Sequence, residues 1–289
     1  MTPPDLERLI DRAEGVLARL EASLPPPPSV PDWQALAHRW RTRQGRGWLE
    51  AIRHLQQIRL ADLQDVETQK ARIVANTRQF LAGKRANNVL LTGARGTGKS
   101  SLIRALLTEY ASAGLRVIEV DKSDLVDLPH IVDLVAGRAE RFILYCDDLS
   151  FDEGELSYKA LKSVLDGSLA AVPDNVLIYA TSNRRHLLPE YFEENAHTRH
   201  VGEEIHPAEA IEEKISLSER FGLWLSFYPF SQEEYLRIVQ HWLTEFGVSL
   251  TNWEGELRTE ALQWSLLRGS RNGRVAWQFA RDWAGRVQP

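Results

Sequence analysis

The stretch Gly93-Ala94-Arg95-Gly96-Thr97-Gly98-Lys99-Ser100 has the residue types and spacing of a phosphate-binding loop: a glycine, four variable residues, then Gly-Lys-Ser. Glycines let backbone N–H groups curl around an anion, and a following helix directs the positive end of its dipole at the same anion. In this pattern Lys99 reaches the β- and γ-phosphates and Ser100 binds Mg²⁺. We therefore expect these eight residues, with Ser101 in the next position, to bind Mg-ATP.

Two neighbouring aspartates, Asp147 and Asp148, follow an apolar stretch typical of a buried strand. We expect Asp147 to hold Mg²⁺ together with Ser100, and Asp148 to polarise the attacking water. Many proteins of the wider class with such a phosphate-binding loop carry glutamate at the second of these two positions, where this chain has Asp148. Aspartate is one methylene shorter, so the water must lie closer or hydrolysis must be slow. Glu153 and Glu155 are alternative bases, and the two aspartates could instead only cap the strand end.

Three further polar positions could complete the site. Asn183 follows another apolar strand candidate, where it could orient the water or touch the γ-phosphate, or belong to an ordinary turn. Arg220 precedes the last strand candidate and could reach the nucleotide of a neighbouring subunit, stabilising charge in the transition state, or form a structural ion pair. Arg274, at the start of a C-terminal helix, could reach back to the phosphates, with Arg271 as the second choice.

A group of histidines and glutamates in a polar stretch has spacing that would permit a Zn²⁺ site. The group consists of His197, His200, Glu203, Glu204 and His206. Histidines in a long polar insertion are more often solvated than metal-bound, so we expect no metal there.

Elements that would position these residues follow from the apolar pattern. Five strand candidates occupy residues 88–91, 116–120, 141–146, 175–180 and 223–227. Continuous apolar strands separated by helices predict a parallel sheet covered on both faces. From Ser231, which forms a capping box with Glu234, the pattern becomes wholly helical. The sequence therefore predicts an α/β nucleotide-binding domain over residues 58–229 and a helical domain over 230–289.

The first 57 residues are expected to form a separate helical segment. Apolar residues at helical spacing predict a helix over about residues 5–24, and Pro25 to Pro28 form a stiff linker. A second helical piece is expected around Trp33 and Trp40, among several arginines, either docked on the main domain or free to bind a partner or nucleic acid. Residues 58–63 are expected to pack over the adenine, followed by a helix over 66–81.

Composition limits the class of protein. The chain has 289 residues, of which 43% are hydrophobic, and a net charge of −5, which does not favour a general nucleic-acid binder. The single cysteine, Cys146, excludes an internal disulfide. With no long apolar run and no signal-peptide pattern, we expect a soluble cytoplasmic protein with no membrane contact.

The motifs in this order resemble the AAA+ superfamily. The strings at residues 86–91, 147–151, 179–187 and 217–223 more closely resemble an uncharacterised bacterial AAA+ ATP-binding family, a domain of unknown function, over about residues 35–289. The resemblance implies a three-layer αβα domain with strand order 5-1-4-3-2, a helical lid, and a ring or partial ring of subunits. The Asp-Asp strand end is also similar to bacterial replication initiators and helicase loaders.

Three functions are consistent with this resemblance. The favoured one is an ATPase that hydrolyses Mg-ATP to remodel or load an assembly of protein or of protein and DNA. The second is a switch or scaffold that binds ATP and hydrolyses it little, which the shorter Asp148 permits. The third is a nucleic-acid-associated loader, supported by the arginine-rich C-terminal stretch. Residues 121–129 contain no aromatic residue or glycine, which argues against a protein unfoldase.

Overall fold

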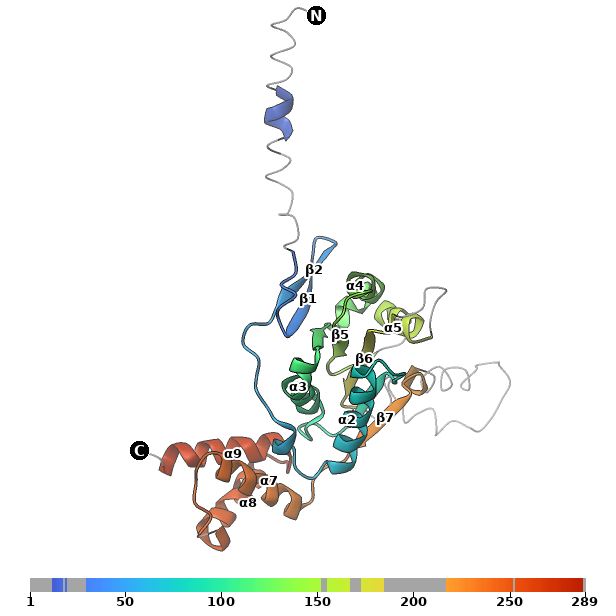
Figure 1. Cartoon of the computed structure of the whole chain (residues 1–289). Helices are drawn as coiled ribbons and strands as arrows, with labels where there is room; N and C mark the ends of the chain where they lie inside the picture. Colours follow the sequence, from blue (N-terminus) through green and yellow to red (C-terminus); the bar gives the residue numbers. More distant parts are fainter. Residues whose placement is uncertain are drawn as a thin grey trace, which may run out of the picture.

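The computed structural model describes residues 12–17, 19, 30–151, 155–166, 173–184, 217–251 and 253–287. The described chain forms a mixed α/β body with a group of helices beside it, formed by the C-terminal part of the chain (Figure 1). The helix expected over residues 5–24 lies largely outside the described residues.

Seven strands form one sheet in the order β2-β1-β4-β5-β6-β3-β7. The strands are β1 (Ala37–Arg43), β2 (Arg46–Ala51), β3 (Val89–Gly93), β4 (Leu115–Glu119), β5 (Arg141–Cys146), β6 (Val176–Ser182) and β7 (Leu223–Phe227). Only the β1–β2 pair is antiparallel. The five expected strands run β4-β5-β6-β3-β7, so the expected five-stranded sheet is extended by two strands beyond β4.

Helices cover both faces of the sheet, because successive side chains of a buried strand point to opposite faces. Ile143 and Tyr145 of β5 pack with helices α2 (Glu67–Leu81) and α3 (Lys99–Tyr110). Phe142 and Leu144 pack on the other face with helices α4 (Leu128–Val135) and α5 (Leu156–Asp166). This is why the strands are apolar without alternation, and why their polar ends alone are available for chemistry.

The helical piece expected around Trp33 and Trp40 is wrong. Residues 37–51 form the β1–β2 hairpin, and β1 pairs in parallel with β4. Alternation explains the difference, since His38 and Trp40 are fully buried while Arg39 and Arg41 lie on the other side of the strand. Arg39 forms an ion pair with Glu119, 2.6 Å away, so this arginine contributes to docking on the main sheet.

Trp40 fastens the hairpin to the sheet. Its indole packs over Gly47, where a Cβ atom would lie 1.9 Å from the ring, and its Nε1 donates to Asp127 Oδ2 at 3.0 Å. Trp33 adds a second contact beneath the guanidinium of Arg138, 3.9 Å from the ring centroid. The division of the chain at residue 57 remains a prediction, although the hairpin before it shares the main sheet.

The C-terminal helices are α7 (Gln232–Glu245), α8 (Arg258–Leu267) and α9 (Gly273–Val287), with a π-helical turn at Trp253–Leu257. They enclose a hydrophobic core of their own, which includes Tyr235 and Phe279. The expected capping box is present at the start of α7, since Ser231 and Glu234 each accept a hydrogen bond from the backbone of the other. None of the helices described is long and apolar enough to cross a membrane.

Replacing Trp40 with alanine should lower the free energy of unfolding by about 3–5 kcal/mol, because a fully buried aromatic side chain and its cavity are lost. Urea denaturation measures the change. Trp48→Ala is the matched control, since Trp48 lies in the paired strand but is only half-buried, and it should cost clearly less. Equal losses for both variants would contradict the anchoring role of Trp40.

Candidate nucleotide site

The phosphate-binding loop lies between β3, which ends at Gly93, and α3, which begins at Lys99. Gly93, Gly96 and Gly98 all have positive φ angles, of 125°, 77° and 96°. A side chain at Gly93 would also place its Cβ 1.9 Å from the carbonyl oxygen of Phe227 on the neighbouring strand. Glycine is therefore required by both backbone conformation and space, and the strand–loop–helix context expected from the sequence is present.

Lys99 is folded into the loop. Its Nζ donates to the carbonyl oxygens of Gly93 and Ala94, each at 2.7 Å, and to Asn183 Oδ1 at 3.0 Å. Burial lowers the pKa of Lys99 to about 8, with Arg95 and Arg274 acting in the same direction and the two aspartates opposing them. The ammonium group is still mostly protonated at neutral pH, so it can attract a phosphate to this position.

Asp147 is held by hydroxyl groups. Ser100 Oγ donates to Asp147 Oδ1 at 2.7 Å, and Thr181 Oγ1 donates to the same oxygen at 2.5 Å. Burial alone would raise the pKa of Asp147, but the hydrogen bonds from the hydroxyls of Thr181 and Ser100 hold it below its ordinary value. An ionised carboxylate beside a hydroxyl is a set of hard oxygen donors, which fits the preference of Mg²⁺.

Asn183 connects the loop to the second aspartate. Its Oδ1 accepts from Lys99, and its Nδ2 donates to Asp148 Oδ1. Asp148 itself is exposed, has a φ of 51°, and donates its backbone N–H to Thr181 Oγ1 at 2.9 Å. The structure thus brings together the ends of β3, β5 and β6, with Asn183 between Lys99 and Asp148.

Thr181 is a residue that sequence reasoning missed. It bonds the carboxylate of Asp147 and the backbone of Asp148 at once. The signal was present in the polar end of the fourth apolar strand candidate, where Thr181 precedes Asn183 by two positions. Because β5 and β6 are neighbours, a hydroxyl at that place faces the aspartates of the adjacent strand.

The lid helices approach the loop directly. Gly273 donates its backbone N–H to the carbonyl oxygen of Gly96 at 2.9 Å, and α9 begins at that residue. Arg274, the next residue, contributes to the lowered pKa of Lys99, so its charge lies near the loop. Arg271 lines a cavity of about 700 Å³. The cavity lies between the loop and the lid and is also lined by Ala94, Arg95, Thr97, Pro229, Phe230, Ser265, Leu266, Gly269, Ser270 and Asn272.

Other expected residues lie apart from this group. Arg220 forms an ion pair with Asp166 at the end of α5, and Glu155 accepts a hydrogen bond from Lys122 at 2.8 Å. Leu63, in the segment expected over the adenine, is buried, and its side chain approaches Gly98 of the loop. Glu153 and all three histidines of the suspected zinc group lie outside the described residues. Their roles, and those of all the residues above, stay predictions.

The hydrogen bonds from Thr181 generate a pH prediction. Because the folded-state pKa of Asp147 is lowered, their contribution is present above the unfolded pKa and is lost as pH falls through the folded pKa. Thr181→Val should therefore cost about 1.5–3 kcal/mol at neutral pH and less in acid, measured by urea denaturation across pH. Thr92→Val is the control.

Thr92 is also a buried threonine at a strand end, but its hydroxyl accepts from the indole of Trp224 at 2.7 Å and bonds no carboxylate in the described structure. Thr92→Val should therefore lower the free energy of unfolding by the same amount at neutral and at acidic pH. A pH-independent loss in Thr181→Val would show that the threonine does not stabilise the charge of Asp147.

Three solved structures are similar to this chain at low sequence identity. A point mutant of Thermotoga maritima RuvB matches with a TM-score of 0.51 and 16% identity, over 80% of this chain and 66% of that one. Aeropyrum pernix Orc1, solved in complex with DNA, matches with a TM-score of 0.50 and 15% identity, over 78% of this chain and 62% of that one. A DNA replication initiation factor matches with a TM-score of 0.46 and 17% identity, over 77% of this chain and 63% of that one.

The present chain spans slightly less than two thirds of the length of each. The likenesses to RuvB and Orc1 show the fold alone, and they agree with the AAA+ resemblance of the motifs. No curated protein matches the sequence. A family model does match residues 33–287, which contain the hairpin, the nucleotide site and the lid helices. The chain belongs to the family described as "Protein of unknown function (DUF815)", which has an AAA+ fold.

Proposed function

We propose that this protein is an ATPase that binds Mg-ATP at the loop between β3 and α3 and hydrolyses it. The observation that carries the proposal is the convergence of Lys99, Ser100, Asp147, Asp148 and Asn183 at one edge of the sheet. Each residue type has a part in phosphoryl transfer, where catalysis consists mainly of positioning and charge stabilisation.

In the proposed reaction the chain supplies charge and orientation. Lys99 leaves the carbonyl oxygens of the loop and bonds the phosphates, which restores favourable solvation of its charge. Ser100 and Asp147 would hold Mg²⁺, which supplies neutralisation of the phosphate oxygens when bound. Asp148 accepts a proton from the attacking water, and Asn183 fixes the carboxylate of Asp148 through the amide that already bonds it.

Arg274 and Arg220 are proposed to act from outside the sheet. Arg274 is the second residue of α9, the helix whose first N–H bonds the loop, so a small lid movement would bring its guanidinium to the phosphates. Arg220 would exchange Asp166 for the nucleotide of a neighbouring subunit, which makes catalysis a property of a homo-oligomer, a ring or partial ring. The cavity of about 700 Å³ between loop and lid has room for the rest of the nucleotide.

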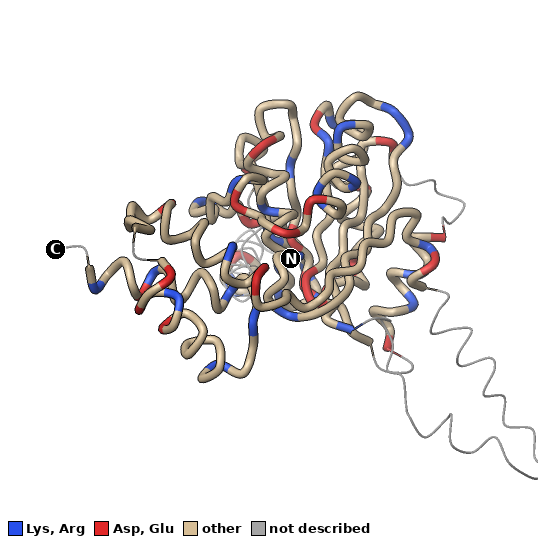
Figure 2. Tube along the Cα trace, turned by 90° about the horizontal axis from the view of Figure 1, so that it is seen from below, with Lys and Arg blue, Asp and Glu red and all other residues tan. Residues whose placement is uncertain are grey.

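The client is proposed to be a protein or protein–DNA assembly that the ATPase remodels or loads. The Orc1 structure, which was solved in complex with DNA, supports the loader version through fold alone. Lysine and arginine positions are interspersed with acidic ones over the described chain (Figure 2). Arg286 in the arginine-rich C-terminal stretch is paired with Glu260 and Asp282. Salt-dependent DNA binding would separate a loader from a remodeller of proteins.

Lys99→Ala should weaken binding of Mg-ATP by about one to two decades, since a charge-assisted hydrogen bond worth about 1.5–3 kcal/mol is lost. Titration calorimetry on the pure protein measures it. Lys84→Ala removes an exposed lysine away from the loop and should bind as the wild type does. Wild-type affinity in Lys99→Ala would remove the basis of the assignment.

Asp148→Asn and Arg220→Ala should each bind ATP and lose turnover, by about 10²-fold or more for loss of a general base and up to about 10³–10⁵-fold for a finger arginine. A mixture of the two inactive variants should regain activity, because a mixed interface places an intact Arg220 against an intact Asp148.

Glu155→Gln is the control for the choice of base and should keep full turnover. No recovery in the mixture, from variants shown to co-assemble, would contradict action between subunits. Tight ATP binding without turnover in the wild type would identify a nucleotide switch instead.

A further inference from the structure

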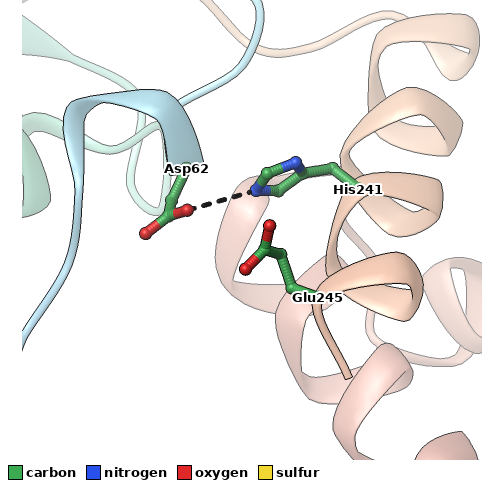
Figure 3. A group of neighbouring side chains, drawn as sticks. All are labelled: Asp62, His241 and Glu245. Carbon is green, nitrogen blue, oxygen red and sulfur yellow. Dashed lines mark ion pairs between the residues drawn. The ribbon is translucent and has the colours of Figure 1, made fainter. Parts of the chain in front are cut away.

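A second group of metal-ligating side chains lies away from the phosphate loop. Asp62 ends the short 3₁₀ turn η1 (Leu60–Asp62), and His241 and Glu245 belong to helix α7 (Figure 3). One ligand atom from each residue lies within 4.8 Å of the other two. Figure 3 shows the imidazole of His241 directed at Asp62 across the gap between η1 and α7, with the carboxylate of Glu245 beside the ring.

The positions of the three donors are typical of metal ligands. His241 and Glu245 are four residues apart on one helix, so both side chains leave the same face of α7. The third donor, Asp62, comes from an element distant in the sequence, and its side chain is only 7% exposed.

The imidazole provides an independent indication of a ligand. His241 Nε2 is a buried atom with no hydrogen-bond partner, and the nearest carboxylate oxygen, Asp62 Oδ1, is 3.5 Å away. The ring nitrogen therefore has only a long ion pair with Asp62, and a closer partner would lower the free energy of this partly desolvated group. A cation between Nε2 and the two carboxylates would supply it.

The guanidinium group of Arg59 already lies between the carboxylates of Asp62 and Glu245. Arg59 donates to Asp62 Oδ1 at 2.6 Å and to Glu245 Oε2 at 2.5 Å, so positive charge joins the two carboxylates. The side chain of Arg59 is 56% exposed, whereas that of Asp62 is 7% exposed. Arg59 can therefore turn out to solvent while the carboxylates keep their places.

We propose that Asp62, His241 and Glu245 form a binding site for a divalent transition metal such as Zn²⁺, which replaces Arg59 and joins η1 to α7. One imidazole and two carboxylates suit Zn²⁺ and its neighbours, whereas Mg²⁺ prefers oxygen donors alone. This site is separate from the proposed ATP site and does not depend on it.

The metal would act at the joint between the sheet and the lid. Leu63, next to Asp62, lies beside Gly98 of the phosphate loop, and a second ion pair, Arg237 with Asp65 at 2.5 Å, joins the same two segments. A bound ion would hold α7 against η1 more firmly than an exposed guanidinium does. The metal is thus inferred to restrict lid movement.

The test titrates Zn²⁺ into the full chain by calorimetry, with excess Mg²⁺ present to occupy the Ser100–Asp147 site. His197, His200 and His206 are first replaced by alanine, which removes the other histidine group. One equivalent should bind and raise Tm. His241→Ala should weaken binding by about 10–100-fold or more, since even residues that only support a ligand have effects of this size.

Arg59→Ala supplies the decisive comparison, because removing the competing guanidinium should tighten Zn²⁺ binding. Arg237→Ala breaks the neighbouring ion pair without touching a donor and should leave Zn²⁺ affinity unchanged. If His241→Ala does not fold, Glu245→Gln takes its place with the same expected loss. Unchanged affinity in Arg59→Ala, or no Zn²⁺ binding by the wild type, would show a plain ionic cluster and overturn the proposal.

Discussion

The half-buried carboxylate of Asp147 is the point where a hydrophobic sheet has to accommodate a charge. Cys146, just before it, is fully buried in the apolar core, and burial by itself disfavours ionisation of Asp147. Hydroxyls from α3 and β6 overcome this by bonding the carboxylate directly. The same hydroxyls fix the relative positions of the phosphate loop, β5 and β6, so the charge and the alignment of three elements depend on one another.

The neighbouring chain of contacts from Lys99 through Asn183 to Asp148 has a different character. It links a buried ammonium to an exposed carboxylate through one amide group. Lys99 donates its other two bonds to the loop's own carbonyl oxygens. A phosphate would have to compete for a lysine that is already satisfied, whereas Asp147 would keep its hydroxyl partners. The proposed phosphate-binding half of the site is therefore more easily rearranged than the proposed metal-binding half.

Local sequence patterns were sufficient for the parts of the fold that are determined locally. The glycines of residues 93–98 and the apolar strands each carry their signal within a few positions. The β1–β2 hairpin was missed because Trp33, Leu36 and Trp40 also match helical spacing. Residues 37–43 are stabilised as a strand by contacts distant in the sequence, namely pairing with β4 and the hydrogen bond from Trp40 to Asp127. The roles of Asp62 and Asp166 depend on partners far along the chain, and no local pattern indicates such pairs.

Two of the contacts between the C-terminal helices and the rest of the described chain involve α9 and α7. One is a neutral backbone hydrogen bond, from Gly273 to Gly96 of the phosphate loop. The other is the ionic group that joins η1 to α7. Helices α7 and α9 pack together in one hydrophobic core, so both contacts are made by the same packed group of helices. The C-terminal helices therefore contact the phosphate loop and η1 at the same time.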